Sequence, residues 1–109
     1  IAEACAQAGA EVTLIAGPVS LKTTHPAIKR IDVESADEMY EAAVSAFEDS
    51  DAAIMCAAVA DYKPAECCDK KMKRSADDMT LKLVPNRDIA AALGAKYFFG
   101  FEFEDGTKV

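Results

Sequence analysis

A run of uncharged residues restricts the fold more than any other part of the sequence. It covers residues 52–59 and lies between Asp51 and Asp61. The run is far shorter than the ~20 apolar residues that a membrane-spanning helix needs. A short apolar run between polar residues is typical of a strand that is covered on both faces, as in a parallel sheet. We therefore expect residues 52–59 to form an interior strand.

The rest of the chain alternates between the apolar spacings of strands and those of helices. Further strands are expected at residues 11–16, 29–33, 80–84 and 96–101. Helices are expected at residues 1–7, between Ser35 and Asp49, and at 88–93. The polar residues 61–78, which include Pro64, predict a long loop. Strands that alternate with helices predict a three-layer, Rossmann-like α/β fold with a mostly parallel sheet.

Certain residues indicate where the helices begin and end. Gly9 is expected to stop the first helix in the left-handed conformation. Ser35 and Glu38 have the spacing of a capping box, in which the hydroxyl and the carboxylate accept hydrogen bonds from free amides. Asn86 can cap the short last helix, and Gly94 is expected to stop it. Helical spacing places on one face of the middle helix the apolar residues Met39, Ala42, Ala43 and Phe47.

Composition and charge argue against several classes of protein. The 109 residues are 51% hydrophobic and 28% charged, so the chain is too apolar to be disordered and has the length of one domain. The net charge of -7 argues against nucleic-acid binding, which needs a positive face. No apolar run is long enough to cross a membrane, and residues 1–5 lack the basic start of a secretory signal. The missing initiator Met indicates a chain cut from something longer.

The cysteines predict reduced thiols. Cys5 and Cys56 lie among apolar residues and are interpreted as small core residues. Cys67 and Cys68 are adjacent, and no second pair with zinc-ligand spacing accompanies them. We therefore expect no metal site, and a cytoplasmic protein.

Candidate binding residues follow the expected strands, at the edge where parallel sheets bind ligands. Asp61 could accept hydrogen bonds from a base, an amine or a ribose, or it could simply cap a turn. The basic residues 70–74 could neutralise a phosphate chain, or they could be a solvated loop. The helix start at residues 86–89 favours an anion, but it could also be an ordinary N-cap. On these grounds alone the sequence predicts an α/β ligand-binding domain and no particular reaction.

Six segments occur in an order and at spacings that are found together in one family. They read A-E-V-T-L-I-A-G-P-V at 10–19, D-V-E-S-A-D-E-M at 32–39, A-A-V-A-D-Y-K-P at 57–64, K-M-K-R at 71–74, L-K-L-V-P-N-R-D-I at 81–89 and G-F at 100–101. Together they resemble the phosphopantothenoylcysteine synthetase domain of coenzyme A biosynthesis. In many bacteria that domain is the C-terminal half of a bifunctional flavoprotein.

The resemblance implies a ligase that joins 4'-phosphopantothenate to cysteine. In the bacterial form, CTP with Mg²⁺ activates the carboxylate as an acyl-cytidylate, and the cysteine amine then displaces CMP. FMN is implied only if a decarboxylase half precedes this domain. Members of the family are dimers, and an uncovered sheet edge here also favours a homodimer.

The family's motifs also imply roles for individual residues. The residues expected to bind the nucleotide are Met55, Cys56, Ala57, Asp61, Lys71, Arg87, Asp88, Ile89, Ala90 and Phe101. Asp61 would bind the cytosine or the ribose, and Phe101 would pack on the cytosine. Residues 87–90 would lie against the phosphates. Lys71 would contact the triphosphate and assist the activation, which makes it the expected catalytic residue.

The sequence departs from the family in three respects. An N-x-S-S-G-like segment is absent before Ile1, a lysine-bearing helix is absent after Glu102, and Arg87 stands where the family usually has Pro. We therefore expect one incomplete synthetase-like domain over residues 1–109, with little or no synthetase activity if these residues are all there is. Release of CMP from CTP, phosphopantothenate and cysteine by this chain would overturn that expectation.

Two other functions stay open at this point. The first is a non-catalytic nucleotide-binding or assembly fragment with the same fold. The second is a generic Rossmann-like, dinucleotide-binding oxidoreductase domain, against which the missing G-x-G-x-x-G motif argues. Titrations with CTP and with NADH distinguish these hypotheses.

Overall fold

The chain folds into a mixed α/β structure with one parallel and one antiparallel pair of strands. The computed structural model describes residues 1–66, 74 and 76–96. Its elements are α1 (Ala2–Gln7), β1 (Val12–Ala16), β2 (Ile28–Asp32), α2 (Ala36–Phe47), β3 (Tyr62–Pro64), β4 (Leu83–Pro85) and α3 (Ile89–Lys96). None of the helices in this part of the chain is long and apolar enough to cross a membrane.

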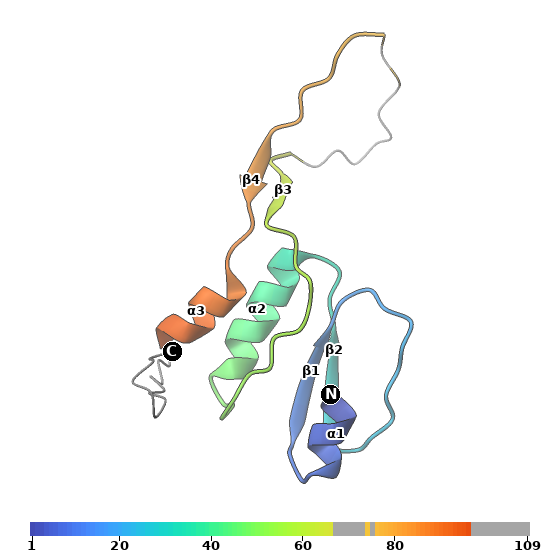
Figure 1. The fold of residues 1–109 in the computed structure, drawn as a ribbon, viewed down its shortest axis with the longest axis vertical. Helices are drawn as coiled ribbons and strands as arrows, with labels where there is room; N and C mark the ends of the chain where they lie inside the picture. The colour runs from blue at the N-terminus through green and yellow to red at the C-terminus, as the bar shows by residue number, and fades with distance from the viewer. Residues whose placement is uncertain (67–73, 75, 97–109) are drawn as a thin grey trace, which may run out of the picture.

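The parallel pair of β1 and β2 forms the base of the structure (Figure 1). Val12 pairs with Ile28 and Ala16 with Asp32, close to the bounds that the sequence predicts for both strands. The ladder extends by one bond, because the Val33 amide donates to the Ala16 carbonyl over 2.8 Å. Helix α1 packs against both strands, α2 packs against β1, and α3 packs against α2. The most deeply buried apolar residues among these elements are Ala6, Ala16, Val33, Ile89 and Leu93.

Helix α2 begins with the capping box that the sequence predicts. The Glu38 amide donates to the Ser35 hydroxyl over 3.1 Å, and the Glu38 carboxylate accepts from the Glu34 amide over 3.1 Å. The predicted apolar face of this helix is half-buried. Gly9 follows α1 with a φ of 101°, so the predicted left-handed stop is also confirmed.

The interior strand expected at residues 52–59 is absent, so that prediction was wrong. These residues are exposed apart from Val59, which is half-buried. Within the described part of the chain, no backbone hydrogen bond joins them to another segment. A strand exists only where a neighbour completes its ladder, and among the described residues β1 pairs only with β2. Figure 1 shows the segment rising from the end of α2 to β3 without a paired neighbour.

The long loop expected at residues 61–78 was also wrong in part, because it begins with β3. Tyr62 pairs with Pro85 and Pro64 with Leu83, and the Ala65 amide donates to the Lys82 carbonyl over 2.9 Å. The strand expected at 80–84 accordingly begins at Leu83. Figure 1 shows that this hairpin projects beyond α2, away from β1 and β2.

Three smaller expectations near the C-terminal end and at Cys56 need correction or lie outside the described residues. Gly94 does not stop the last helix, since α3 continues to Lys96. Cys56 is exposed rather than part of the core, because the segment that carries it has no cover. The strand expected at 96–101 lies outside the described residues, except for Lys96, which ends α3.

Candidate functional site

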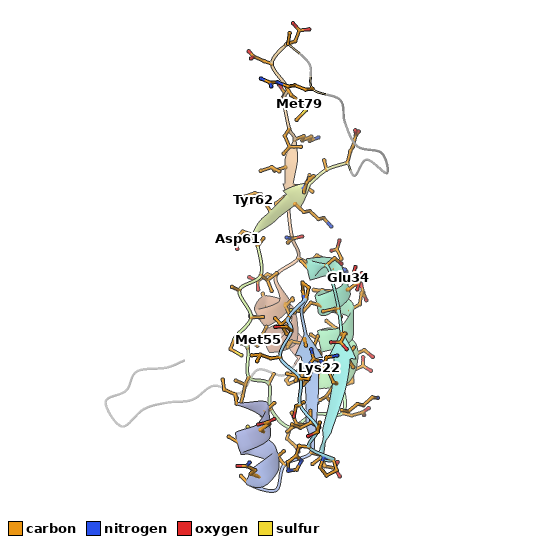
Figure 2. The ribbon with its side chains drawn as sticks, turned by 90° about the vertical axis from the view of Figure 1, so that its right-hand side faces the viewer. Lys22, Glu34, Met55, Asp61, Tyr62 and Met79 are labelled. Carbon is orange, nitrogen blue, oxygen red and sulfur yellow. The ribbon has the colours of Figure 1, made fainter. Side chains whose placement is uncertain are left out.

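The segment that leads to Asp61 carries the first group of predicted site residues. Met55, Cys56 and Ala57 are all exposed, and the exposed fraction of Met55 is 50%. Figure 2 shows Met55 and Asp61 on the segment that rises past α3 to the base of the hairpin. Small side chains and free backbone groups along such a segment let a flat ligand approach closely.

Asn86 joins the end of this segment to the loop before α3. Its backbone amide donates to the Asp61 carbonyl over 2.7 Å, and its side-chain Nδ2 donates to the Ala60 carbonyl over 2.7 Å. The Asn86 Oδ1 atom is buried and has no hydrogen-bond partner. Asn86 was expected to cap the helix, but it instead holds Asp61 beside the start of α3. We call Ala60, Asp61 and Asn86 the junction.

The start of α3 is capped by Asp88 rather than by Asn86. The Asp88 Oδ1 atom accepts from the Ala91 amide over 3.0 Å, and the Ala92 amide makes the first bond of the helical pattern to the Asp88 carbonyl over 3.1 Å. The helix itself supplies no acceptor for the amides of Ile89 and Ala90. Those two N–H groups point out of the helix end, where an anion is favoured.

Arg87 lies between the junction and α3, and its guanidinium is bound to α2. It makes an ion pair of 2.9 Å with Glu41 and one of 3.6 Å with Asp37, and it stacks over the Tyr40 ring at 3.8 Å from the centroid. Lys63 of β3 makes an ion pair and hydrogen bond with the same Asp37. We call Asp37, Tyr40, Glu41, Lys63 and Arg87 the Asp37 cluster.

The charges in the Asp37 cluster stabilise one another. The Lys63 ammonium, which donates a hydrogen bond to Asp37, holds the pKa of that carboxyl below its ordinary value, and the Arg87 charge acts in the same direction. The hydrogen bond to Glu41 raises the pKa of Arg87. Asp37 is therefore ionised and Arg87 charged at neutral pH. The sequence analysis missed this cluster, although Asp37 and Glu41 have the i, i+4 spacing that puts them on one helix face.

The Asp61 carbonyl accepts from the amide of Asn86, the residue before Arg87, so the backbone of Asp61 lies close to the segment that leads into α3. The nucleotide-binding roles expected of Asp61 and residues 87–90 stay predictions. Lys71 and Phe101 lie outside the described residues. No group of three His, Cys, Asp or Glu side chains that could hold a metal ion occurs in residues 1–66, 74 and 76–96.

A separate open pocket lies beside the end of β1. It has a volume of about 250 Å³ and is lined mainly by apolar atoms, with Lys22 and Arg30 among its lining residues. Arg30 is already engaged, since it donates to the Leu21 carbonyl over 2.6 Å and to Asp32 over 2.8 Å. Neither Asp61 nor Asn86 lines this pocket.

The comparison with protein families decides what kind of domain carries this site. Residues 1–108 match the family described as the DNA/pantothenate metabolism flavoprotein C-terminal domain. The chain belongs to this family. The flavoprotein C-terminal domain is also what the sequence resemblance implied, so the predicted family is confirmed.

Curated relatives support the assignment and are much longer than this chain. A cysteine/cysteine sulfinic acid decarboxylase from an unknown prokaryotic organism is 52% identical over 94 residues, which are 86% of this chain and 26% of that protein. The coenzyme A biosynthesis bifunctional protein CoaBC of Vibrio parahaemolyticus is 50% identical over 97 residues, which are 87% of this chain and 24% of that protein. The chain thus spans about a quarter of the length of these relatives.

A solved structure has the same fold over most of the chain. The crystal structure of the C-terminal domain of the coenzyme A biosynthesis bifunctional protein CoaBC matches with a TM-score of 0.69 and 33% sequence identity. The match covers 86% of this chain and 42% of that chain.

Proposed function

We propose that this domain takes part in coenzyme A biosynthesis as a phosphopantothenate–cysteine ligase, which joins 4'-phosphopantothenate to cysteine by means of CTP. The family membership and the similarity to the coenzyme A biosynthesis proteins CoaBC support the pathway. The observation that carries the proposal is the 2.7 Å bond between the Asn86 amide and the Asp61 carbonyl. In the proposed site, the Asp61 carboxylate binds the nucleoside and the helix end that follows Asn86 binds the phosphates.

The proposed chemistry begins with a carboxylate that is a poor electrophile. Attack of the phosphopantothenate carboxylate oxygen on the α-phosphorus of CTP forms the acyl-cytidylate and releases pyrophosphate. The cysteine amine then attacks the acyl carbon, and CMP leaves with the bonding electrons. The protein's part is to position the reactants and to stabilise the negative charge on the phosphates.

The predicted site residues each have a part in that scheme. The Asp61 carboxylate is exposed and accepts hydrogen bonds from the cytosine amine or the ribose hydroxyls. The amides of Ile89 and Ala90 donate to phosphate oxygens, and Met55, Cys56 and Ala57 lie along the nucleoside. Asp88 orients the helix end through its bond to the Ala91 amide. Lys71 is proposed to contact the triphosphate, and Phe101 to pack on the cytosine.

The proposed cofactors require few ligands from the described residues. Mg²⁺ typically takes substrate phosphates and one or two carboxylates as ligands, so it needs no dedicated cage of side chains. When bound, Mg²⁺ would neutralise phosphate charge. FMN would be needed only if a decarboxylase half precedes this domain. We further propose a cytoplasmic homodimer.

We also propose that the whole domain is a three-layer, Rossmann-like fold with a mostly parallel sheet. The parallel pairing of β1 and β2 and the likeness to the CoaBC domain support this.

The test is a product assay on the full-length protein. Release of CMP is expected only when CTP, phosphopantothenate and cysteine are all present, whereas release of pyrophosphate requires CTP and phosphopantothenate. Asp61→Asn is expected to raise the KM for CTP. Asp51→Asn serves as the matched control, because it changes an exposed Asp at the other end of the same segment. Binding of NADH without binding of CTP would contradict the proposal.

A further inference from the structure

Two cations from separate segments meet at one carboxylate in the Asp37 cluster. The Asp37 Oδ2 atom pairs with Lys63 of β3, and its Oδ1 atom lies 3.6 Å from Arg87. Each oxygen thus holds a different segment of the chain. Without the Asp37 charge, the ammonium and the guanidinium would face each other on the surface of α2, and like charges repel.

Asp37 itself is held in place by the start of α2. It is the second residue of the helix, and the Ser35 and Glu38 bonds of the capping box fix the turn that carries it. The Arg87 guanidinium is further fixed by Glu41 and the Tyr40 ring. A planar guanidinium suits this combination of stacking and ion pairing. The contacts within the Asp37 cluster and at the start of α2 therefore hold Asp37 and Arg87 in place on this helix.

The segments that Asp37 holds are the two that form the junction. Lys63 lies two positions after Asp61, and Arg87 directly follows Asn86. The Asn86 amide donates to the Asp61 carbonyl, and each of the two segments joined by this bond carries a residue that pairs with Asp37. Fixing Lys63 and Arg87 fixes the separation of Asp61 from the start of α3.

We propose that Asp37 is a positioning residue, which sets the junction for the nucleotide through Lys63 and Arg87. The inference deepens the proposed function and rests on it for the nucleotide. The side chains are 40–47% exposed for Lys63, Asp37 and Arg87, so solvent weakens each pair. The expected effect of removing the Asp37 charge is therefore modest, about two- to tenfold in CTP affinity.

The experiment compares Asp37→Asn, Asp37→Glu and the control Asp32→Asn in the full-length protein. Asp32 is a matched control, because it also pairs with an arginine on the surface but lies on β2. Two quantities are measured: the dissociation constant for CTP, and amide hydrogen exchange at Asn86 and Val33. Both amides donate to a backbone carbonyl, one at the junction and one in the parallel sheet.

Asp37→Asn is expected to speed exchange at Asn86 about two- to tenfold, to leave Val33 unchanged, and to weaken CTP binding. Asp37→Glu keeps the charge and is expected to retain most of the slow exchange at Asn86 and most of the CTP affinity. Asp32→Asn is expected to change neither quantity. Unchanged exchange at Asn86 in Asp37→Asn overturns the proposal. Equal acceleration at Val33 also overturns it, because Asp37 would then act on stability in general. Absence of CTP binding in the unmodified protein instead refutes the proposed function. The exchange rates at Asn86 still test whether Asp37 holds the junction in place.

Discussion

Substitutions of Asn86 separate two opposing effects at the junction. Asn86→Ala removes the 2.7 Å bond from Nδ2 to the Ala60 carbonyl, which costs about 0.5–1.5 kcal/mol. It also removes the buried, unpartnered Oδ1 atom, whose burial costs about 1–3 kcal/mol. The two terms oppose each other, so the variant should lie between about 0.5 kcal/mol less stable and about 2.5 kcal/mol more stable than the unmodified protein.

Asn86→Asp should be much worse, although it preserves the shape of the side chain. It replaces the Nδ2 donor with an oxygen that faces the Ala60 carbonyl, so that two acceptors oppose each other. The favourable interaction of the new negative charge with the start of α3 offsets only ~0.3–1 kcal/mol of this loss. We expect a loss of about 1–3 kcal/mol, from the unmade bond to a charged group. Urea unfolding of the full-length protein measures both variants. An Asn86→Asp variant as stable as Asn86→Ala would refute the hydrogen-bond assignment.

Three further predictions concern the elements that support the junction. Ser35→Ala removes the N-cap of α2 and should lower the free energy of unfolding by about 1 kcal/mol in urea titrations, whereas no change would argue against the capping box. Leu93→Ala should cost about 2–5 kcal/mol by the same measurement, because Leu93 is only 6% exposed. The lowered pKa of Asp37 means that its stabilising effect is fully present above the ordinary pKa of Asp and is lost as the pH falls through the lowered pKa. Asp37→Asn should therefore flatten the acid limb of stability against pH, and an unchanged limb would show that Asp37 is not involved.

Local signals in the sequence were sufficient for the elements that depend on nearby residues. The Ser35–Glu38 spacing, the position of Gly9 and the apolar runs of β1 and β2 each predicted what the structure has. In all of these the hydrogen-bond partner lies close in sequence or the run pairs with the next strand. The family motifs likewise predict that Asp61 and the start of α3 belong to one site, and this stays a prediction, although the Asp61 carbonyl accepts from the amide of Asn86 just before α3.

The errors arise where the outcome depends on distant partners. Residues 52–59 have the composition of an interior strand, but composition does not supply the neighbouring strands that complete a ladder. Asn86 has the right type and position for an N-cap, yet its amide and side chain find the carbonyls of Asp61 and Ala60 instead, and Asp88 caps α3. The Asp37 cluster joins three segments, which no single stretch of sequence indicates.

The central claim is that Asp61 and the start of α3 contact one nucleotide. Amide chemical shifts of the full-length protein during a CTP titration test it most directly. The account predicts that the amides of Asp61, Ile89 and Ala90 shift together with one dissociation constant, and that Asp61→Asn weakens that constant for all three. CTP binding that leaves Asp61 and the α3 amides unshifted would contradict the account.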